Sequence, residues 1–399
     1  MSDGHRTSQS QSGGALAGVR VIDMSTIGMG PLATQILGDA GADVIKVESA
    51  AGDIFRHVAP QRHEAMSHTH LNFNRNKRSV VLDLRAEAGR RAMLRLLSDA
   101  DVFVSNARPA SLARLGLDYA TLEASHPRLI HCGCYGFSEE GPYAGRPAVD
   151  DVIQAASGMA WLQGLGQDAP HYVKTIVADK VCSLHVVNAI GMALYARERS
   201  GRGQAIEVPM FECLVSFVVP EHLAGMTFDP PQGPAGYPRL LDPYRRPFRT
   251  LDGFMGVVPY NEAHWKAFFE LAGSPEFFED ERFSTQTQRS LHYSDLYRLV
   301  EDTLAGKTTA EWIRLLSEAD IPFAPVNSLD ELIADPHLNA IGFWHSVEHP
   351  TEGRLRMPGI PVRMSRTPGS IRRHAPGLGE HTAEVLRDIE AGCSKGARQ

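Results

Sequence analysis

The sequence has few of the features that define a protein class at once. No cysteines have CxxC spacing, and an odd total of five in 399 residues indicates reduced thiols rather than a disulfide framework. The first 14 residues are rich in Ser, Gln and Gly and have no apolar run of the signal-peptide kind, so they predict a loose tail. We find no apolar segment long enough to span a bilayer. We therefore expect a cytoplasmic protein without a membrane partner.

An excess of one charge is also missing. The chain has 40 basic and 47 acidic residues and a pI near 6.2, which gives no general electrostatic reason to expect nucleic acid as a partner. A GxSxG nucleophile elbow, a Walker loop and a solenoid repeat are absent. His63, His68 and His70 have no matching cysteine or carboxylate spacing, so we interpret them as surface loop and expect no metal site.

Short β-branched runs alternate with helical patterns in the N-terminal half. The strand-like runs VRVIDM, DVIKVE, SVVLDL, DVFVSN and RLIHCGCYGF are interleaved with helix-like PLATQILGDA and EAGRRAMLRLLSDA. This alternation predicts an α/β fold with a parallel sheet covered on both faces. Helical patterns then cover residues 150–163 and 180–199, and the second should end at Gly201 or Gly203.

The character of the sequence changes after Pro220. A Pro- and Gly-rich stretch over 230–238 predicts a linker. Asp252-Gly253 predicts a β-hairpin, and helical patterns with strand-like IPFAPVNS complete a smaller α+β unit. We expect a tail over 1–14, a large α/β domain over 15–225, a small domain over 226–330, and strand-like pieces with a final helix over 331–399.

A glycine-rich turn follows the first strand. Gly28, Gly30 and Ala33 match the GxGxxA dinucleotide fingerprint, and Glu48 ends the next strand. Pro31 removes one of the backbone N–H groups that the fingerprint aims at a pyrophosphate. A tight Gly-Pro turn at a helix start is the alternative, and it argues against a nicotinamide site.

Cations flank two neighbouring strands. Residues 74–78 (NRNKR) come before SVVLDL, and Asn106, Arg108 and Arg114 follow DVFVSN. Loops at strand ends of open α/β sheets bind ligands, so these groups suit a polyphosphate, with solvated surface charge as the alternative.

Acidic residues stand at two predicted helix starts. Asp179 lies where the helix dipole would favour an ionised, nucleophilic carboxylate, but the residues alone favour the alternative that it is an N-cap. Asp150 and Asp151 share this ambiguity. Cys132 and Cys134 alternate along one strand and are interpreted as buried and unreactive.

Several motifs occur in a characteristic order: LAGVRVIDMS, GPLATQILGDAGADVIKVE, NRNKRSVVLDL, NARPASLARLG, YGF, GPY, SGRGQAIEVPM and APGLGEHTAEVL. With these motifs, residues 16 to about 389 resemble the class III CoA-transferase family, which includes formyl-CoA and carnitine CoA-transferases and, as a branch, the α-methylacyl-CoA racemases. The resemblance implies an interlocked homodimer with a Rossmann-like large domain built from both ends of the chain.

The resemblance also implies roles for individual residues. Asp179 matches the nucleophile that carries coenzyme A as an aspartyl thioester, and Asp150 matches a second acid of the catalytic site. Acyl-CoA and a small carboxylic acid are the implied substrates, and no tightly bound cofactor is expected. The residues that the resemblance implies as CoA contacts are Asn106, Ala107, Arg108, Arg114, Leu82, Arg85 and Arg146.

Two positions separate the branches of the family. Racemases have a His-Asp pair at the place of Val149-Asp150, and Val149 cannot carry a proton, so CoA transfer is favoured over racemisation. A CoA-binding protein without catalysis stays an alternative. The formyl-CoA transferase branch has a glutamine at the place of Gly28 and a glycine-rich mobile loop that we do not find over 230–245, so we do not expect oxalate/formate specificity.

Overall fold

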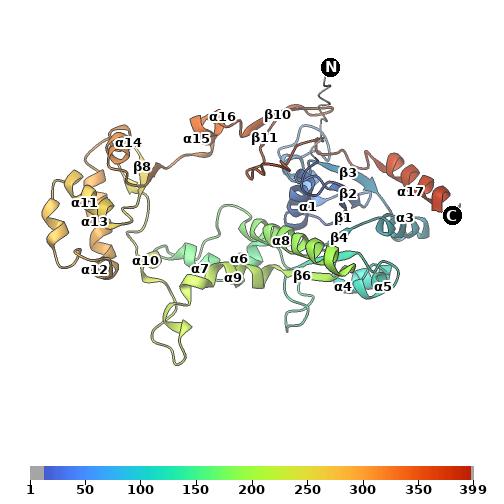
Figure 1. Ribbon diagram of the computed structural model, residues 1–399, viewed down its shortest axis with the longest axis horizontal. Coiled ribbons are helices and arrows are strands. Elements are labelled where there is room, and N and C mark those ends of the chain that lie inside the picture. Colours follow the sequence, from blue (N-terminus) through green and yellow to red (C-terminus); the bar gives the residue numbers. More distant parts are fainter. Residues whose placement is uncertain (1–12, 397–399) are drawn as a thin grey trace, which may run out of the picture. The chain divides into compact units, whose positions relative to one another are not determined.

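The computed structural model describes residues 13–396, and most of the predicted tail lies outside them. The chain divides into two compact units (Figure 1). The first comprises residues up to 160, 172–217 and those from 340 onward, and the second comprises 161–171 and 218–339. Residues from both ends of the chain therefore share the first unit.

A six-stranded parallel sheet forms the centre of the first unit. Its spatial order is β3-β2-β1-β4-β5-β6, and every neighbouring pair is parallel. The strands are β1 (Arg20–Met24), β2 (Asp43–Glu48), β3 (Lys77–Val81), β4 (Val102–Ser105), β5 (Ile130–Tyr135) and β6 (Ala205–Pro209). This is the Rossmann order, and the strand sequence reverses between β1 and β4. The predicted α/β class is confirmed.

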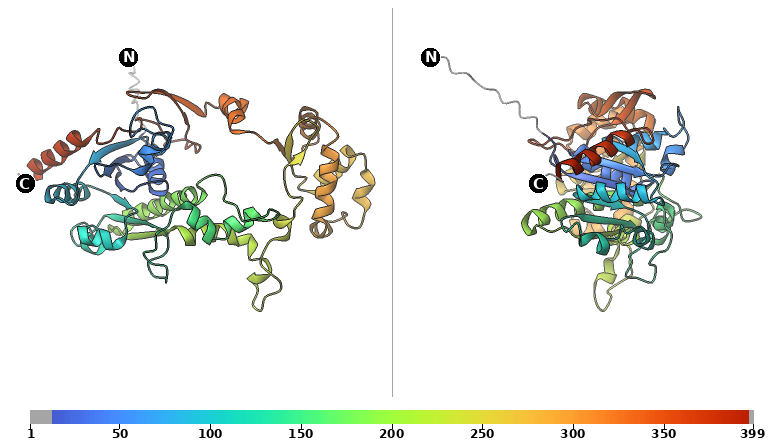
Figure 2. Two further views of the ribbon diagram at one scale, coloured as in Figure 1. Left: turned by 180° about the vertical axis from the view of Figure 1, so that it is seen from behind. Right: turned by 90° about the vertical axis from the view of Figure 1, so that its right-hand side faces the viewer.

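Helices cover the sheet. Helix α1 (Met29–Asp39) packs against α8 (Val177–Ser200), and α8 also contacts β5 and β6. Helix α3 (Glu87–Ser98) packs beside the C-terminal helix α17 (Thr382–Gly396), as Figures 1 and 2 show. Because side chains alternate between the faces of a strand, Ile22 and Ile45 enter one apolar cluster with Met93, Leu96 and Val385.

Shorter elements complete the first unit. They are η1 (Ile54–His57), α2 (His68–Phe73), α4 (Pro109–Leu115), α5 (Tyr119–Glu123), α6 (Asp150–Ala156), and the antiparallel pair β10 (Trp344–His349) and β11 (Gly353–Pro358). Helices α7 (Met159–Gly164), α9 (Met210–His222) and α16 (Pro336–Ala340) cross the division between the units.

The second unit is built on a three-stranded antiparallel sheet. Phe248 pairs with Met255 across the predicted hairpin at Asp252-Gly253, which is confirmed. Its strands are β7 (Phe248–Arg249), β8 (Phe254–Val257) and β9 (Phe323–Pro325). Its helices are η2 (Ala224–Thr227), α10 (Pro238–Leu241), α11 (Glu262–Leu271), η3 (Pro275–Glu279), α12 (Gln286–Leu291), α13 (Tyr293–Leu304), α14 (Thr309–Glu318) and α15 (Leu329–Ala334).

The expected boundaries need correction. The units divide at 217/218 and 339/340 rather than 225/226 and 330/331, and residues 161–171 belong to the second unit. The Pro- and Gly-rich stretch 230–238 lies inside the second unit, so it is not a linker between the two. The helical pattern over 150–163 is broken at Gly158, whose φ of 85° is left-handed.

Helix α8 corrects the expectation about apolar length. It is long and apolar enough to cross a bilayer by length and composition alone. Here it packs on α1 and the sheet, and it buries Asp179, Ser183 and Arg197 against protein. It ends at Gly201, as predicted, in the left-handed conformation.

Candidate active site

A cavity of about 230 Å³ opens at the carboxyl ends of the central strands. Residues 26 and 27 follow β1 and residues 106 and 108 follow β4, the two strands between which the strand order reverses. Ligands of open α/β sheets bind at this crevice. The titratable side chains that line the cavity are Arg108, Tyr135, Glu139, Arg146, Asp150 and Asp179, with Cys134.

Asp179 lies in the first turn of α8 and faces this cavity. The N-cap of the helix is Ile176, so the N-cap interpretation of Asp179 is wrong. Burial and the nearby charge of Asp150 raise the pKa of Asp179 to about 7, against the opposing effect of a hydrogen bond from the backbone N–H of Met29. The expectation that the helix start would favour the ionised form is therefore also corrected. Desolvation outweighs the dipole because the residue is only 6% exposed.

Asp150 is the first residue of α6 and positions the start of α8. Its Oδ1 accepts a hydrogen bond of 3.1 Å from the backbone N–H of Asp179, and its Oδ2 accepts one of 2.5 Å from Gln154 Nε2. Gln154 Oε1 in turn accepts from the backbone N–H of Val173 at 2.9 Å, in the segment leading to α8. Asp150 thus satisfies a free N–H of the first turn and places a second carboxylate beside Asp179.

The start of α1 approaches Asp179 very closely. A Cβ atom at Gly28, the N-cap of α1, would lie 2.4 Å from Asp179 Oδ2. Ser183 Oγ lies 2.7 Å from the carbonyl oxygens of both Met29 and Asp179, which joins the two helix starts. The space occupied by the Asp179 carboxylate exists because residue 28 has no side chain.

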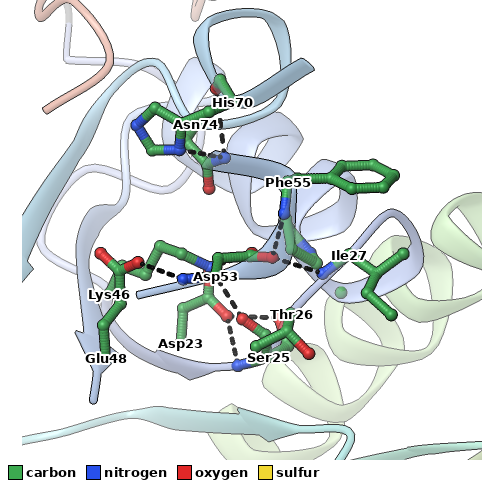
Figure 3. A network of polar contacts seen from close by, with 12 residues as sticks. Asp23, Ser25, Thr26, Ile27, Lys46, Glu48, Asp53, Phe55, His70 and Asn74 are labelled. Atoms are coloured by element: carbon green, nitrogen blue, oxygen red, sulfur yellow. Dashed lines mark hydrogen bonds and ion pairs between the residues drawn. The ribbon is translucent and has the colours of Figure 1, made fainter. Parts of the chain in front are cut away.

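A buried ion pair holds the loop between β1 and α1 (Figure 3). Lys46 Nζ donates to the Ser25 carbonyl at 2.7 Å and to Asp53 Oδ2 at 3.0 Å. Asp53 Oδ1 accepts from the backbone N–H of Ile27 at 3.0 Å. Ile27 has a φ of 71°, a strained value for a β-branched residue. Such strain persists only where the surroundings enforce it, so the pair fixes the loop that borders the cavity.

The cationic stretch 74–78 is part of the protein interior, which corrects the expectation of a polyphosphate site there. Lys77 and Arg78 lie in β3 itself, and Lys77 pairs with Asp23 at 3.0 Å. Burial lowers the pKa of Lys77 to about 8 despite that partner. Both arginines of the stretch also form ion pairs. Arg75 pairs with Asp39 at 2.7 Å, and Arg78 pairs with Asp43 at 2.7 Å and with Glu384 at 3.0 Å.

The predicted CoA contacts divide into two groups. Asn106, Arg108 and Arg146 line the cavity. Asn106 exchanges two hydrogen bonds with the Thr26 backbone, at 3.0 and 3.2 Å, so it connects the loops after β1 and β4. Arg108 is exposed, and Arg146 lies over the Tyr143 ring at 4.1 Å.

The second group does not line this cavity. Ala107 packs against the apolar cluster of the sheet, and Leu82 is buried in that cluster. Arg85 and Arg114 are exposed, and Arg114 donates to Ser111 Oγ at 3.1 Å.

The dinucleotide fingerprint does not build its usual site. Both carboxylate oxygens of Glu48 are bound to Arg56, at 2.7 and 2.8 Å, and Oε2 also accepts from Ser79. Glu48 is buried and cannot take a ribose hydroxyl in this state. The tight-turn interpretation of Gly28 to Pro31 fits this arrangement.

Two minor predictions have different outcomes. His70 is buried in α2, where burial lowers its pKa to about 3, so the surface-loop interpretation is wrong for it. No group of side chains that could hold a metal occurs among the described residues. Cys132 and Cys134 are buried, as predicted, and the four cysteines that the structure describes are free.

Sequence reasoning missed the contribution of β5. Tyr135 ends this strand, and Tyr135, Phe137 and Glu139 line the cavity. Their position at or just after the end of a strand could have indicated this, because the carboxyl ends of parallel strands lie at the same edge of a sheet. The left-handed backbone of Ile27 could not be predicted from the sequence, because β-branched residues rarely adopt that conformation.

The fold and site define an α/β protein with a buried acidic pair at the reversal point of a Rossmann-like sheet. Residues 16–382 match CoA-transferase family III. The chain is 32% identical to the succinate–glutarate CoA-transferase of Agrobacterium fabrum over 386 residues, covering 94% of this chain and 96% of that protein. It is 30% identical to the formyl-CoA:oxalate CoA-transferase of Shigella sonnei, covering 94% and 95%.

A solved structure agrees with these relatives. The crystal structure of a CAIB/BAIF family protein from Brucella suis superposes with a TM-score of 0.80 at 30% identity, covering 94% of this chain and 100% of that one. The chain belongs to CoA-transferase family III. It is a CoA-transferase, and acyl-CoA is its substrate.

Proposed function

We propose that Asp179 is the nucleophile that carries coenzyme A between two carboxylic acids. The observation that carries the proposal is a buried carboxylate with a raised pKa, facing a cavity at the reversal point of the sheet. Poor solvation makes a carboxylate a stronger nucleophile, and a pKa near 7 leaves about half of it ionised at neutral pH.

The proposed exchange balances in four steps. An Asp179 oxygen attacks the acyl-CoA carbonyl and displaces the CoA thiolate. The product is a mixed anhydride between Asp179 and the donor acid. The thiolate then attacks the Asp179 carbonyl, which gives an aspartyl-CoA thioester and releases the donor acid with the bridging oxygen. The acceptor carboxylate attacks this thioester and displaces the CoA thiolate, which gives a second anhydride. The thiolate then attacks the acceptor carbonyl of that anhydride and forms the new acyl-CoA. Asp179 is regenerated with one oxygen from the acceptor.

The cavity fits the reacting end of the substrate. Its volume of about 230 Å³ is small for a whole coenzyme, so the thioester and acyl group would occupy it. The exposed Arg108 and Arg146 lie along it and suit a phosphate or a second carboxylate. Relatives named as succinate–glutarate and succinyl-CoA–L-malate CoA-transferases make succinyl-CoA the first donor to test.

Racemisation is the less favoured alternative. Val149 is the N-cap of α6, is half exposed, and offers no group for proton transfer where the family's racemases are expected to have histidine. By the same resemblance we propose an interlocked homodimer in the cytoplasm.

Isotope transfer tests the covalent proposal directly. Purified protein is given succinyl-CoA and glutarate labelled with ¹⁸O in its carboxylates, and the peptide containing Asp179 is then weighed by mass spectrometry. We expect glutaryl-CoA to form and the label to appear in Asp179. Exchange without label in this residue would refute the covalent role.

Two variants complete the test. Asp179→Ala should lower exchange to less than about a hundredth of wild type while CoA still binds, since the attacking atom is lost. Asp151→Ala is the matched control, because Asp151 is an exposed neighbour of Asp150, and it should retain activity. CoA binding without exchange in wild type, over a broad screen of acids, would favour a non-catalytic binding protein.

A further inference from the structure

The second unit contains a cavity of about 280 Å³ that the proposed chemistry does not use. Its lining combines Trp265 and several tyrosines with two arginines, Arg239 and Arg289. None of the described residues that line it is acidic. Apolar walls with a few convergent polar groups are the usual form of a small-molecule site.

Arg289 is a buried cation with donors to spare. Its side chain is 1% exposed, and its Nη1 donates to the Phe283 carbonyl at 2.6 Å. Its Nε and Nη2 have no hydrogen-bond partner among the described residues. The Glu262 carboxylate lies 4.0 Å from Nη2, beyond hydrogen-bond distance, and is 67% exposed. A guanidinium stays charged when buried, so unsatisfied donors there favour the entry of an anion.

Arg239 supplies a second cation that is already fixed in place. Its Nε donates to the Tyr297 hydroxyl at 3.1 Å, and its guanidinium carbon lies 5.3 Å from the centre of the Tyr293 ring. The rings of Tyr293 and Tyr297 stack at 5.8 Å. Because these contacts hold the side chain before any ligand arrives, little further ordering would be needed on binding.

The chemistry of the cavity selects a class of ligand. The planar guanidinium fork matches a carboxylate through paired hydrogen bonds. Trp265, Val257 and Val300 offer apolar surface for the rest of the molecule. A volume just below the range of about 300–1,000 Å³ for drug-sized ligands requires a small one. We infer that the second unit binds a small organic carboxylate with an apolar or aromatic body at Arg239 and Arg289.

Binding of benzoate tests this inference. Benzoate, its neutral analogue benzamide and inorganic phosphate are titrated by calorimetry into the full-length Asp179→Ala variant, which keeps turnover out of the measurement. Benzoate should bind, with benzamide and phosphate each at least about tenfold weaker, because the site requires both the charge and the ring. Equal affinity for benzamide or for phosphate would overturn the inference.

Arginine variants locate the binding. In the same background, Arg239→Gln and Arg289→Gln should each weaken benzoate binding at least about tenfold. Arg298→Gln is the matched control, because Arg298 donates to the Tyr244 hydroxyl and lies over that ring at 4.4 Å but does not line the cavity. It should bind benzoate as its parent does.

The outcome can be read even if one variant fails to fold. Arg239 is only partly buried, so Arg239→Gln decides the question if Arg289→Gln unfolds. Benzoate should also protect Arg239 from phenylglyoxal, read by mass spectrometry. Unchanged affinity in a folded Arg239→Gln variant, or no protection, would refute the site whatever the fate of exchange at Asp179.

Discussion

Asp179 is held in a state that favours reaction over stability. Burial and the Asp150 carboxylate disfavour its charge, while the Met29 N–H favours it, and the pKa settles at about 7. An unfolded aspartate has a pKa of about 3.9. Between these values the folded protein binds a proton that the unfolded chain does not, so stability falls as pH rises through this window. Above pH 7 the ionised carboxylate destabilises the fold.

This linkage predicts that Asp179→Asn is more stable than wild type at pH 8. Asparagine has nearly the shape of the protonated side chain and carries no charge, so up to about 4 kcal/mol of destabilisation is removed. The difference in free energy of unfolding should shrink toward zero near pH 4, where wild type is protonated in the folded state. Denaturant unfolding at both pH values measures it.

The exposed neighbour provides the reference for that experiment. Asp151→Asn should change stability by less than about 0.5 kcal/mol at either pH, as expected of a surface substitution. A wild-type advantage over Asp179→Asn at pH 8 would show that the carboxylate is better solvated or better paired than the structure indicates.

At the scale of elements, the site is a meeting of two helix starts. Helix α1 presents bare backbone at Gly28, and α8 presents Asp179, with Ser183 bonded to both. The Gly28 backbone and the Asp179 carboxylate are packed so closely that no side chain fits between them. The position of the nucleophile therefore depends on how α1 begins as much as on α8 itself.

We predict that Gly28→Ala lowers exchange by about a hundredfold or more while the fold persists. Gly28 has a φ of −106°, which alanine accepts, so the effect would come from the new methyl group displacing the Asp179 carboxylate. A shift of about 1 Å in a reacting group can have an effect of this size. Steady-state kinetics should show the loss mainly in kcat.

A second glycine serves as the comparison. Gly256 lies in β8, where an added Cβ would be in ordinary contact at 3.9 Å from the Ala324 carbonyl oxygen, and Gly256→Ala should keep full activity. Retention of wild-type kcat by Gly28→Ala would mean that Asp179 can react from another position, and the close fit would have no catalytic importance.

Much of the element order was predictable, because it depends on local patterns. Alternating strands and helices placed β1 to β5, α1, α3 and α8, and the Asp-Gly pair placed the hairpin. The environment of 74–78 was not predictable, since the partners of Lys77 and Arg75 are Asp23 and Asp39, far away in sequence. A pattern of cations is the same whether solvent or buried carboxylates surround it.

The candidate site was predictable to a different degree. Asp150 and Asp179 came from the family resemblance, and no local pattern separates a nucleophile from a cap. The raised pKa of Asp179 follows from burial, which depends on the packing of α1 against α8. The close approach of Asp179 to Gly28 could be found only from the three-dimensional structure. A glycine in a turn does not indicate which side chain occupies the space beside it.

For the whole molecule, the surface of α8 bears on assembly. Leu184, Met192 and Tyr195 recur at helical spacing and are 61%, 61% and 67% exposed. A contiguous exposed apolar patch is typical of an interaction surface. The stripe supports the proposed homodimer.

Analytical ultracentrifugation should therefore find a dimer of the 43.7 kDa chain at low micromolar concentration. Met192→Glu should weaken the dimer and lower the Tm measured at a given protein concentration, because the stability of an interlocked dimer depends on association of its two chains. Leu329→Glu, at an exposed apolar residue of the second unit, should leave both unchanged. A wild-type monomer that is folded at this concentration would contradict the proposal.

The contact between Gly28 and Asp179 also restricts how this enzyme can evolve. A larger residue at position 28 would overlap the Asp179 carboxylate, so we expect a single substitution there to lower activity. A lineage that gains a side chain at this position must first shift the start of α8, or change both helix starts together. We expect residue 28 and the first turn of α8 to covary among descendants of this sequence, although they lie far apart in the chain.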